Sequence, residues 1–450
     1  MSEPEPTDFT QPVGARFMTG VFLAVNAIRD LYLLVEGPDC THIKTQFLQG
    51  NHDWLSTLTS VSGFHRIANT ALHPDQMSGS RESAVRDRLQ KIASHPTVPA
   101  VALTSMPMAF VTGADYERVT AEVAEATGKP IIHVPGRSLS RDWLDGYAEV
   151  QSALAGQLEL RQSEAQPENV AIVGYLFDRN EGDHTANLQE LRSILSGLGL
   201  NLVSVWLGGQ HSNELAAVET AGTIISLPYG RRAARTLARR LGARLIETSL
   251  PFGLPATEAW VRQLGAEFGR PEQAEVIIDR ELARVIPKLE WIIPFVFQNL
   301  RVGYVGDPHL LPGLRSYLGV LGASLDMAVI TNHSRHTCEL PADVAELDLL
   351  VEPRISTLGK FLGDRLGRQS VDLLVGSDLG NLNCPVASYE LGFPSPTRHA
   401  LFDRPFLGFG GALALADSLA NAMTARALQE ATRAGSPDGS NSEPGSPHQS

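Results

Sequence analysis

The chain has 450 residues, 43% of them hydrophobic, which is enough for about three domains that each bury a core. Its formal net charge of −13 repels phosphate backbones and anionic lipid, so neither nucleic acid nor a membrane surface is expected as a partner. Because it has only three cysteines, no signal-peptide pattern and no apolar run near the ~20 residues of a bilayer span, we expect a cytoplasmic protein.

Short apolar runs recur along the chain and end at Gly, Pro or Asp, with longer helical stretches between them. Continuous apolar strands separated by helices are typical of parallel sheets that are covered on both faces. Right-handed crossovers then produce doubly wound α/β domains. The predicted strands lie within residues 31–38, 98–105, 129–136, 169–175, 200–209, 222–230, 243–253, 300–308, 324–332, 347–353 and 371–378.

The spacing of these strands divides the chain into three groups. We predict three Rossmann-like α/β domains, at residues 15–160, 165–295 and 296–428, around a central cleft. Residues 1–14 and 429–450 are rich in Pro, Ser, Gly and charged residues, and have too little apolar surface to offset the entropy of ordering. We expect both of these ends to be disordered.

Ligands of parallel α/β sheets bind beyond the carboxyl ends of the strands. Polar residues and turn formers stand at several of these ends, namely Asp39-Cys40, Thr104-Ser105, Tyr229-Gly230, Asp307-Pro308-His309, Asn332-His333 and Ser377-Asp378. A site built from several domains would use these residues. The chain has no GxxxxGK[ST] motif for ATP, no strand–GxGxxG–helix fingerprint, and no HExxH, CxxC or GxSxG motif.

Cys40 follows the first predicted strand and a Gly-Pro break. A free cysteine is commonly a small buried hydrophobe, but a thiolate here could also bind iron or another soft metal. One cysteine cannot hold a cluster alone, so further ligands would come from another chain or from Asp39, His42, His52 or His65. The spacing alone leaves both interpretations open.

Two other segments carry potential ligands. The segment "TNHSRHTCEL" brings His333, His336 and Cys338 close together, but their spacing matches no closed zinc pattern, which favours a solvated loop. The segment 393–412, "FPSPTRHALFDRPFLGFGGA", is either an interdomain clamp or a substrate-contacting loop. In "FDRNEGDHTANL", Asp183 or Thr185 is a plausible N-cap of the next helix.

Five segments, in this order, resemble the nitrogenase component 1 family, which includes nitrogenase subunits, their cofactor-assembly scaffold and the dark-operative protochlorophyllide and chlorophyllide reductases. The first, "EGPDC", is similar to the Gly-Pro-x-Cys turn that carries a bridging-cluster cysteine. The last, "ELGFPSPTRHALFDRPFLGFGGALALADSLANAM", is similar to the closing segment of β-type subunits. The five segments are residues 36–40, 102–119, 169–203, 300–325 and 390–423.

The departures from the family pattern define the type of subunit. The second and third cysteines of a cluster half-site would fall within residues 61–70 and near Ser105–Pro107, where this chain has none. The cysteine that anchors the large catalytic cofactor in α subunits would fall within residues 224–232 and is also missing. The resemblance therefore implies a β-type chain that supplies Cys40, with Asp39 and His65 nearby in sequence, to a [4Fe–4S] cluster shared with a partner.

The resemblance also implies a mechanism. An α-type subunit with more cysteines would complete an α2β2 complex, and a separate P-loop iron–sulfur ATPase would dock transiently and deliver electrons. The interface cluster would pass these electrons to a buried substrate, for which a tetrapyrrole is one candidate. Asp307 and His399 are the expected proton donors.

Two alternatives are kept. A scaffold subunit for metallocluster assembly would also hold iron at Cys40 but would have no turnover. An iron-free α/β binding protein or glycosyltransferase-like enzyme would hold no cluster at all.

Overall fold

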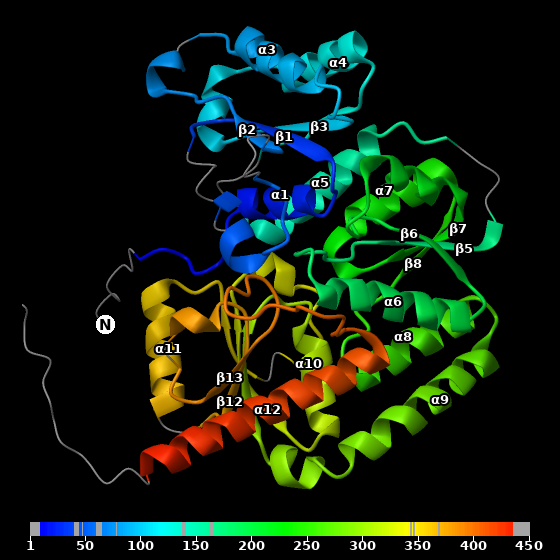
Figure 1. Cartoon of the computed structure of the whole chain (residues 1–450), viewed down its shortest axis with the longest axis vertical. Helices are drawn as coiled ribbons and strands as arrows, with labels where there is room; N and C mark the ends of the chain where they lie inside the picture. Colours follow the sequence, from blue (N-terminus) through cyan, green and yellow to red (C-terminus); the bar gives the residue numbers. More distant parts are fainter. Residues whose placement is uncertain are drawn as a thin grey trace, which may run out of the picture.

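The computed structural model describes residues 10–39, 45–46, 48–59, 65–77, 79–136, 141–161, 166–342, 344, 347–367, 370–382 and 384–434. Cys40 and His42 lie outside the described residues. The described chain forms three separate parallel β-sheets with helices packed around them (Figure 1). The predicted fold class, with several Rossmann-like parallel sheets, is confirmed.

The first sheet, at the top of Figure 1, has the strand order β2-β1-β3-β4. Its strands are β1 (Leu31–Glu36), β2 (Ile67–Asn69), β3 (Ala100–Ser105) and β4 (Ile131–His133). The helices around it are α1 (Phe17–Asn26), η1 (Leu48–His52), η2 (Pro74–Gln76), α3 (Glu82–Ala93), η3 (Pro107–Thr112), α4 (Tyr116–Thr127) and α5 (Trp143–Gln157).

The second sheet, on the right in Figure 1, has the order β6-β5-β7-β8. Its strands are β5 (Gln166–Val173), β6 (Asn201–Val205), β7 (Ala221–Ser226) and β8 (Arg244–Glu247). Its helices are α6 (Gly182–Gly197), η4 (Ser212–Thr220), η5 (Pro228–Gly230), α7 (Arg231–Leu241), α8 (Leu254–Glu267) and α9 (Pro271–Leu289).

The third sheet has five strands in the order β11-β10-β9-β12-β13. These are β9 (Arg301–Gly306), β10 (Ser324–Ile330), β11 (Asp348–Val351), β12 (Leu373–Gly376) and β13 (Ala387–Glu390). The helices are η6 (Ile293–Phe297), α10 (Leu311–Val320), η7 (Ser334–Thr337), α11 (Ile355–Gly367), η9 (Leu379–Leu382) and α12 (Gly408–Ala434). Helix α12, red in Figure 1, packs against β13 of this sheet and against α6, α8 and α9 of the second unit.

The strands β2 and β13 were not among the predicted runs. Each is only three or four residues long, and β2 contains two residues that are only half-buried. Such short segments become strands because a neighbouring strand pairs with them, β1 in one case and β12 in the other. Near the start of the chain, the N–H of Val13 donates to Pro353 O, so a residue that we expected to be disordered contacts the third unit. Near the other end, α12 continues to Ala434, past the boundary at residue 428 that the composition predicted.

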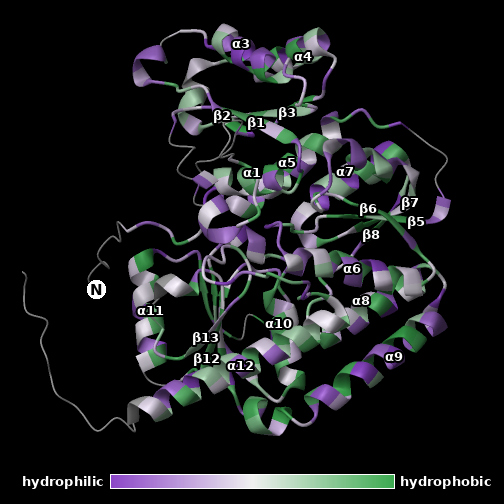
Figure 2. Ribbon diagram, viewed as in Figure 1, coloured by the Kyte–Doolittle hydropathy of each residue, from purple (hydrophilic) through white to green (hydrophobic). Residues whose placement is uncertain are grey.

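One hydrophobic core extends through all three units, and two smaller clusters cover the outer faces of the first and third sheets. Figure 2 shows the strands largely in the hydrophobic colour and the helices with mixed faces, which is the pattern of sheets covered on both sides. Two glycines let α1 and α5 pack closely. A Cβ added at Gly20 would lie 1.8 Å from the carbonyl oxygen of Trp143, and one at Gly146 would lie 2.0 Å from that of Phe17.

Candidate functional site

A cavity of about 120 Å³ lies at the junction of the second and third sheets, closed on one side by the segment between β13 and α12. Its wall combines aromatic and aliphatic side chains with an unusual number of ionisable ones. The polar and ionisable residues are Tyr175, Asp178, Arg179, Asp183, His184, Tyr229, Tyr389, Glu390, Arg398, His399 and Arg404. An apolar pocket with convergent polar groups is the usual form of a small-molecule site.

His399, one of the two predicted proton donors, lines this cavity. Its Nδ1 lies 2.7 Å from Glu181 Oε1, and its ring stacks on Trp54 with the centroids 3.5 Å apart. The other oxygen of Glu181 accepts a hydrogen bond from the backbone N–H of Ala400 at 2.7 Å. The histidine is therefore held in a fixed orientation by groups from the first and second units.

Asp307, the other predicted donor, does not line the cavity but reaches it through Tyr229, which does. The Tyr229 hydroxyl donates to the Asp307 carboxylate at 3.2 and 3.3 Å, and the backbone N–H of His309 donates at 2.8 Å. Burial raises the pKa of Asp307 to about 6 and lowers that of His309 to about 3. Asp307 can therefore carry a proton near neutral pH, while His309 stays neutral.

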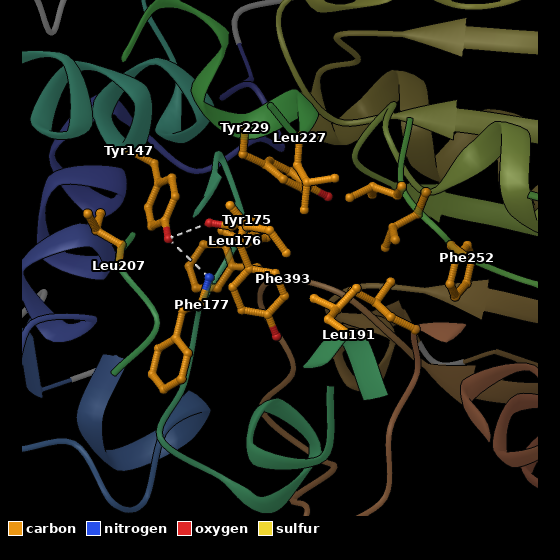
Figure 3. Packing of buried hydrophobic residues seen from close by; sticks show 14 of the residues in the cluster. Tyr147, Tyr175, Leu176, Phe177, Leu191, Leu207, Leu227, Tyr229, Phe252 and Phe393 are labelled. Carbon is orange, nitrogen blue, oxygen red and sulfur yellow. Dashed lines mark hydrogen bonds between the residues drawn. The ribbon is translucent and has the colours of Figure 1, made fainter. Parts of the chain in front are cut away.

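The backbone at the cavity floor is fixed by a tyrosine on α5. Figure 3 shows the Tyr147 hydroxyl donating to the carbonyl oxygen of Tyr175 and accepting from the N–H of Phe177, each at 3.0 Å. Burial raises the pKa of Tyr147 well above its usual value, and both sides of its hydroxyl are engaged by the backbone. Tyr147 therefore acts as a structural anchor, whereas Tyr175, Tyr229 and Tyr389 line the cavity.

The sequence missed the residues that follow β5. The prediction of Asp183 or Thr185 as the helix cap is wrong: the N-cap of α6 is Glu181, and Asp183 lies inside the first turn, where it pairs with Arg179. Asp178 lies between the rings of His184 and His52, with 3.4 Å from its Oδ2 to His52 Nε2. The sequence signal was an aspartate and a histidine six residues apart at a strand exit.

The residues expected near the cluster do not all meet. Asp39 is exposed in the turn after the carboxyl end of β1. His65 precedes β2, whose Ile67 pairs with Leu33, so it lies beside the amino end of β1. With a rise of about 3.3 Å per residue, these positions are roughly 15–20 Å apart along the sheet. His65 is therefore not brought to the Asp39 turn.

The segment that we expected to be a solvated loop contributes to an ionic cluster instead. His336 Nε2 lies 3.2 Å from Asp142 Oδ1 and 3.3 Å from Asp145 Oδ2, both on the N-terminal turn of α5. Arg335 also pairs with Asp145, and the N–H of His333 donates to Asp142 at 2.8 Å. Cys338 is exposed.

The geometry of this cluster resembles a metal site, because the three ligand atoms lie within 4.8 Å of one another. Burial opposes a charge on His336, but hydrogen bonds to Asp142 and Asp145 outweigh it and raise its pKa to about 9. With both ring nitrogens protonated, this histidine is the cation that the two carboxylates pair with. The cluster is therefore an ionic clamp between α5 and the segment after β10.

The model of nitrogenase component 1 type oxidoreductases matches residues 17–424. The chain belongs to this family. It is 28% identical to the nitrogenase vanadium-iron protein beta chain of Trichormus variabilis over 92% of both chains. It is 24% identical to the light-independent protochlorophyllide reductase subunit N of Heliobacterium modesticaldum, over 66% of this chain and 69% of that one. The structure titled "Nitrogenase Cp1 at pH 6.5" superimposes with a TM-score of 0.78 at 16% identity, covering 96% of each chain.

Membership of the nitrogenase component 1 family confirms the predicted resemblance and places the chain among oxidoreductases related to nitrogenase β chains and protochlorophyllide reductases. None of the helices in the described part of the chain combines the length and hydropathy that crossing a bilayer requires.

Proposed function

We propose that this chain is the β-type subunit of a nitrogenase-like oxidoreductase complex. In this proposal an iron–sulfur cluster at the interface with a partner chain passes electrons to a substrate in the cavity between the second and third sheets. The observation that carries the proposal is that both expected proton donors serve this cavity, His399 directly and Asp307 through Tyr229. A reduction that adds hydrogen needs such donors within hydrogen-bond reach.

The proposed [4Fe–4S] cluster would use Cys40, with Asp39 as a second donor from this chain. Asp39 fits because it is exposed at the carboxyl edge of the first sheet, where a ligand shared with another chain has to lie. His65 does not fit, because it lies at the opposite end of β1. The remaining ligands would come from an α-type partner with more cysteines, in an α2β2 complex.

A face for this partner is offered by four exposed apolar residues. They are Trp54, Leu55, Leu401 and Phe402, which are 57, 63, 80 and 68% exposed. The two segments meet where Trp54 stacks on His399 and where the backbone of Phe402 touches Gly182. Large exposed aromatic residues are typical anchors of protein interfaces.

The electron donor in this proposal is a separate P-loop iron–sulfur ATPase that docks transiently, consistent with the lack of a P-loop motif in this sequence. A tetrapyrrole is the substrate class that the protochlorophyllide reductase relatives suggest. The cavity of about 120 Å³ is smaller than the roughly 300–1,000 Å³ typical of sites that enclose drug-sized ligands. A tetrapyrrole would therefore enter only if the segment between β13 and α12 moved outward.

The test is anaerobic co-purification of the chain with a candidate α-type partner, followed by iron and sulfide analysis. Cys40→Ser should remove most of the cluster iron, whereas the matched control Cys338→Ser, at an exposed cysteine, should retain it. Oxidation of the reduced iron–sulfur protein in the presence of substrate supports a reductase. Release of a transferable cluster without turnover supports a scaffold, and an iron-free complex contradicts both.

A further inference from the structure

A row of four polar side chains runs from the cavity wall into the protein. The Tyr175 hydroxyl lies 2.8 Å from His184 Nδ1, and His184 Nε2 contacts Asp178 Oδ1. The other oxygen of Asp178 faces His52 Nε2 at 3.4 Å. All four residues are buried, and Tyr175, Asp178 and His184 line the cavity.

The proton on His52 is fixed by its neighbours. The backbone N–H of Ser395 donates to His52 Nδ1 at 3.0 Å, so this nitrogen is an acceptor. The ring proton must then lie on Nε2, where it points at Asp178. Because His52 is fully buried and its Nδ1 is held by Ser395, its Nε2 stays beside Asp178.

The surroundings of His184 favour its charged form. Two carboxylates face it, Asp178 from the loop after β5 and Asp183 from its own helix, against one cation, Arg179. The other neighbours on its sides are the neutral rings of Tyr175, Phe177 and Phe406. Burial opposes the charge, but attraction to Asp178 outweighs it and raises the pKa of His184.

A charged His184 determines where the Tyr175 proton goes. Both ring N–H groups of His184 then donate, Nε2–H to Asp178 and Nδ1–H to the Tyr175 oxygen. The Tyr175 oxygen also accepts from Asn187 Nδ2 at 3.2 Å, so both of its acceptor positions are used. Burial raises the pKa of Tyr175, so the oxygen keeps its own proton. This proton has no acceptor within the network, and Tyr175 lines the cavity, where a bound molecule could accept it.

We propose that Tyr175 is a proton donor to the substrate in this cavity, and that His184 and Asp178 replace the proton it gives. This inference rests on the proposed function, in which electrons from the iron–sulfur cluster leave the substrate with an added negative charge. The Tyr175 O–H bond breaks as the proton bonds to the anionic substrate atom, and His184 Nδ1–H passes its proton to the tyrosine oxygen. His184 is left neutral with Nε2–H on Asp178, and water in the cavity returns one proton.

The arrangement can be tested without turnover, by NMR of the full chain labelled with ¹⁵N-histidine. A His184→Gln variant assigns the signal among the 13 histidines. We expect the His184 ring to be doubly protonated at pH 7, and we expect Tyr175→Phe to shift its Nδ1 signal. A neutral His184 at pH 7 would overturn the inference.

The catalytic role is tested in the assembled complex. Tyr175→Phe should lower kcat about 10²–10⁴-fold, the usual contribution of a positioned acid, with little change in KM. The control Tyr317→Phe removes a similarly buried hydroxyl that donates to Ala412 O, outside the cavity, and should keep normal kcat.

The outcomes separate the two proposals. Normal kcat in Tyr175→Phe overturns the donor role and leaves the proposed function intact. If the unmodified complex has no turnover, the proposed function fails, and the NMR result alone decides whether the relay exists.

Discussion

The ionic clamp on α5 makes the stability of this protein depend on pH. His336 Nε2 contacts Asp142 and Asp145 at 3.2 and 3.3 Å, and these contacts raise its pKa from 6.5 to about 9. A pKa that is higher in the folded state gives stability that is fully present below pH 6.5 and is lost as the pH rises through 9. A shift of this size corresponds to about 3 kcal/mol, at roughly 1.4 kcal/mol per pH unit.

His336→Gln removes this contribution without stranding both carboxylates. Asp145 keeps its pairs with Arg335 and Arg141, and Asp142 keeps the N–H of His333. We expect the variant to be about 3 kcal/mol less stable than the unmodified protein at pH 6 and nearly equal to it above pH 10.

The assay is urea unfolding across this pH range, followed by the fluorescence of Trp143, which is buried one residue after Asp142. His211→Gln is the matched control, because His211 pairs with Asp30 at 3.3 Å on an exposed surface, where ion pairs contribute little. Parallel pH dependence of His336→Gln and the unmodified protein between pH 6.5 and 9 would refute the clamp.

Three further predictions follow from buried polar groups. The pKa of Asp307 is about 6 in the folded protein, against an ordinary value of 3.8. Its protonation therefore favours the folded state below pH 3.8, and this effect is lost as the pH rises through 6. Over that window the free energy of unfolding of Asp307→Asn, measured with urea, should rise by up to about 3 kcal/mol relative to the unmodified protein. Arg66→Met should lower the free energy of unfolding by about 3 kcal/mol or more, because Arg66 donates to three buried carbonyl oxygens. A loss of under about 0.5 kcal/mol would contradict this. Glu181→Gln should speed hydrogen exchange at the Ala400 amide about tenfold, whereas unchanged exchange would show that this carboxylate does not hold the segment after β13.

The sequence was sufficient for the sheets because burial on both faces leaves a local signal. Runs such as "NVAIVGY" are apolar at nearly every position. The strand formed there, β5, is exposed at residues 166–168 and buried at residues 169–173. The short strands β2 and β13 carry no such signal, because pairing with a distant strand decides their conformation.

The sequence pointed to candidate site residues only where a single polar residue stands in a loop or at the end of a strand. His399 and Asp307 stand in a loop and at a strand end, where polar residues are expected to face ligands. The row of Tyr175, His184 and Asp178 was not found, because its chemistry depends on His52, which is 126 residues from Asp178 in the sequence. A pattern such as Asp-x5-His is explained equally well by helix capping until the distant partner is known.

Three consecutive residues at the end of η1 link the first unit to both sets of proton-carrying groups. His52 faces Asp178, Asp53 accepts hydrogen bonds from the backbone and side-chain N–H groups of Asn180, and the N–H of Trp54 donates to Glu181. Because Asp178 holds His184 and Glu181 holds His399, one short segment of the first unit orients both cavity histidines. A displacement of residues 52–54 would therefore change both groups together.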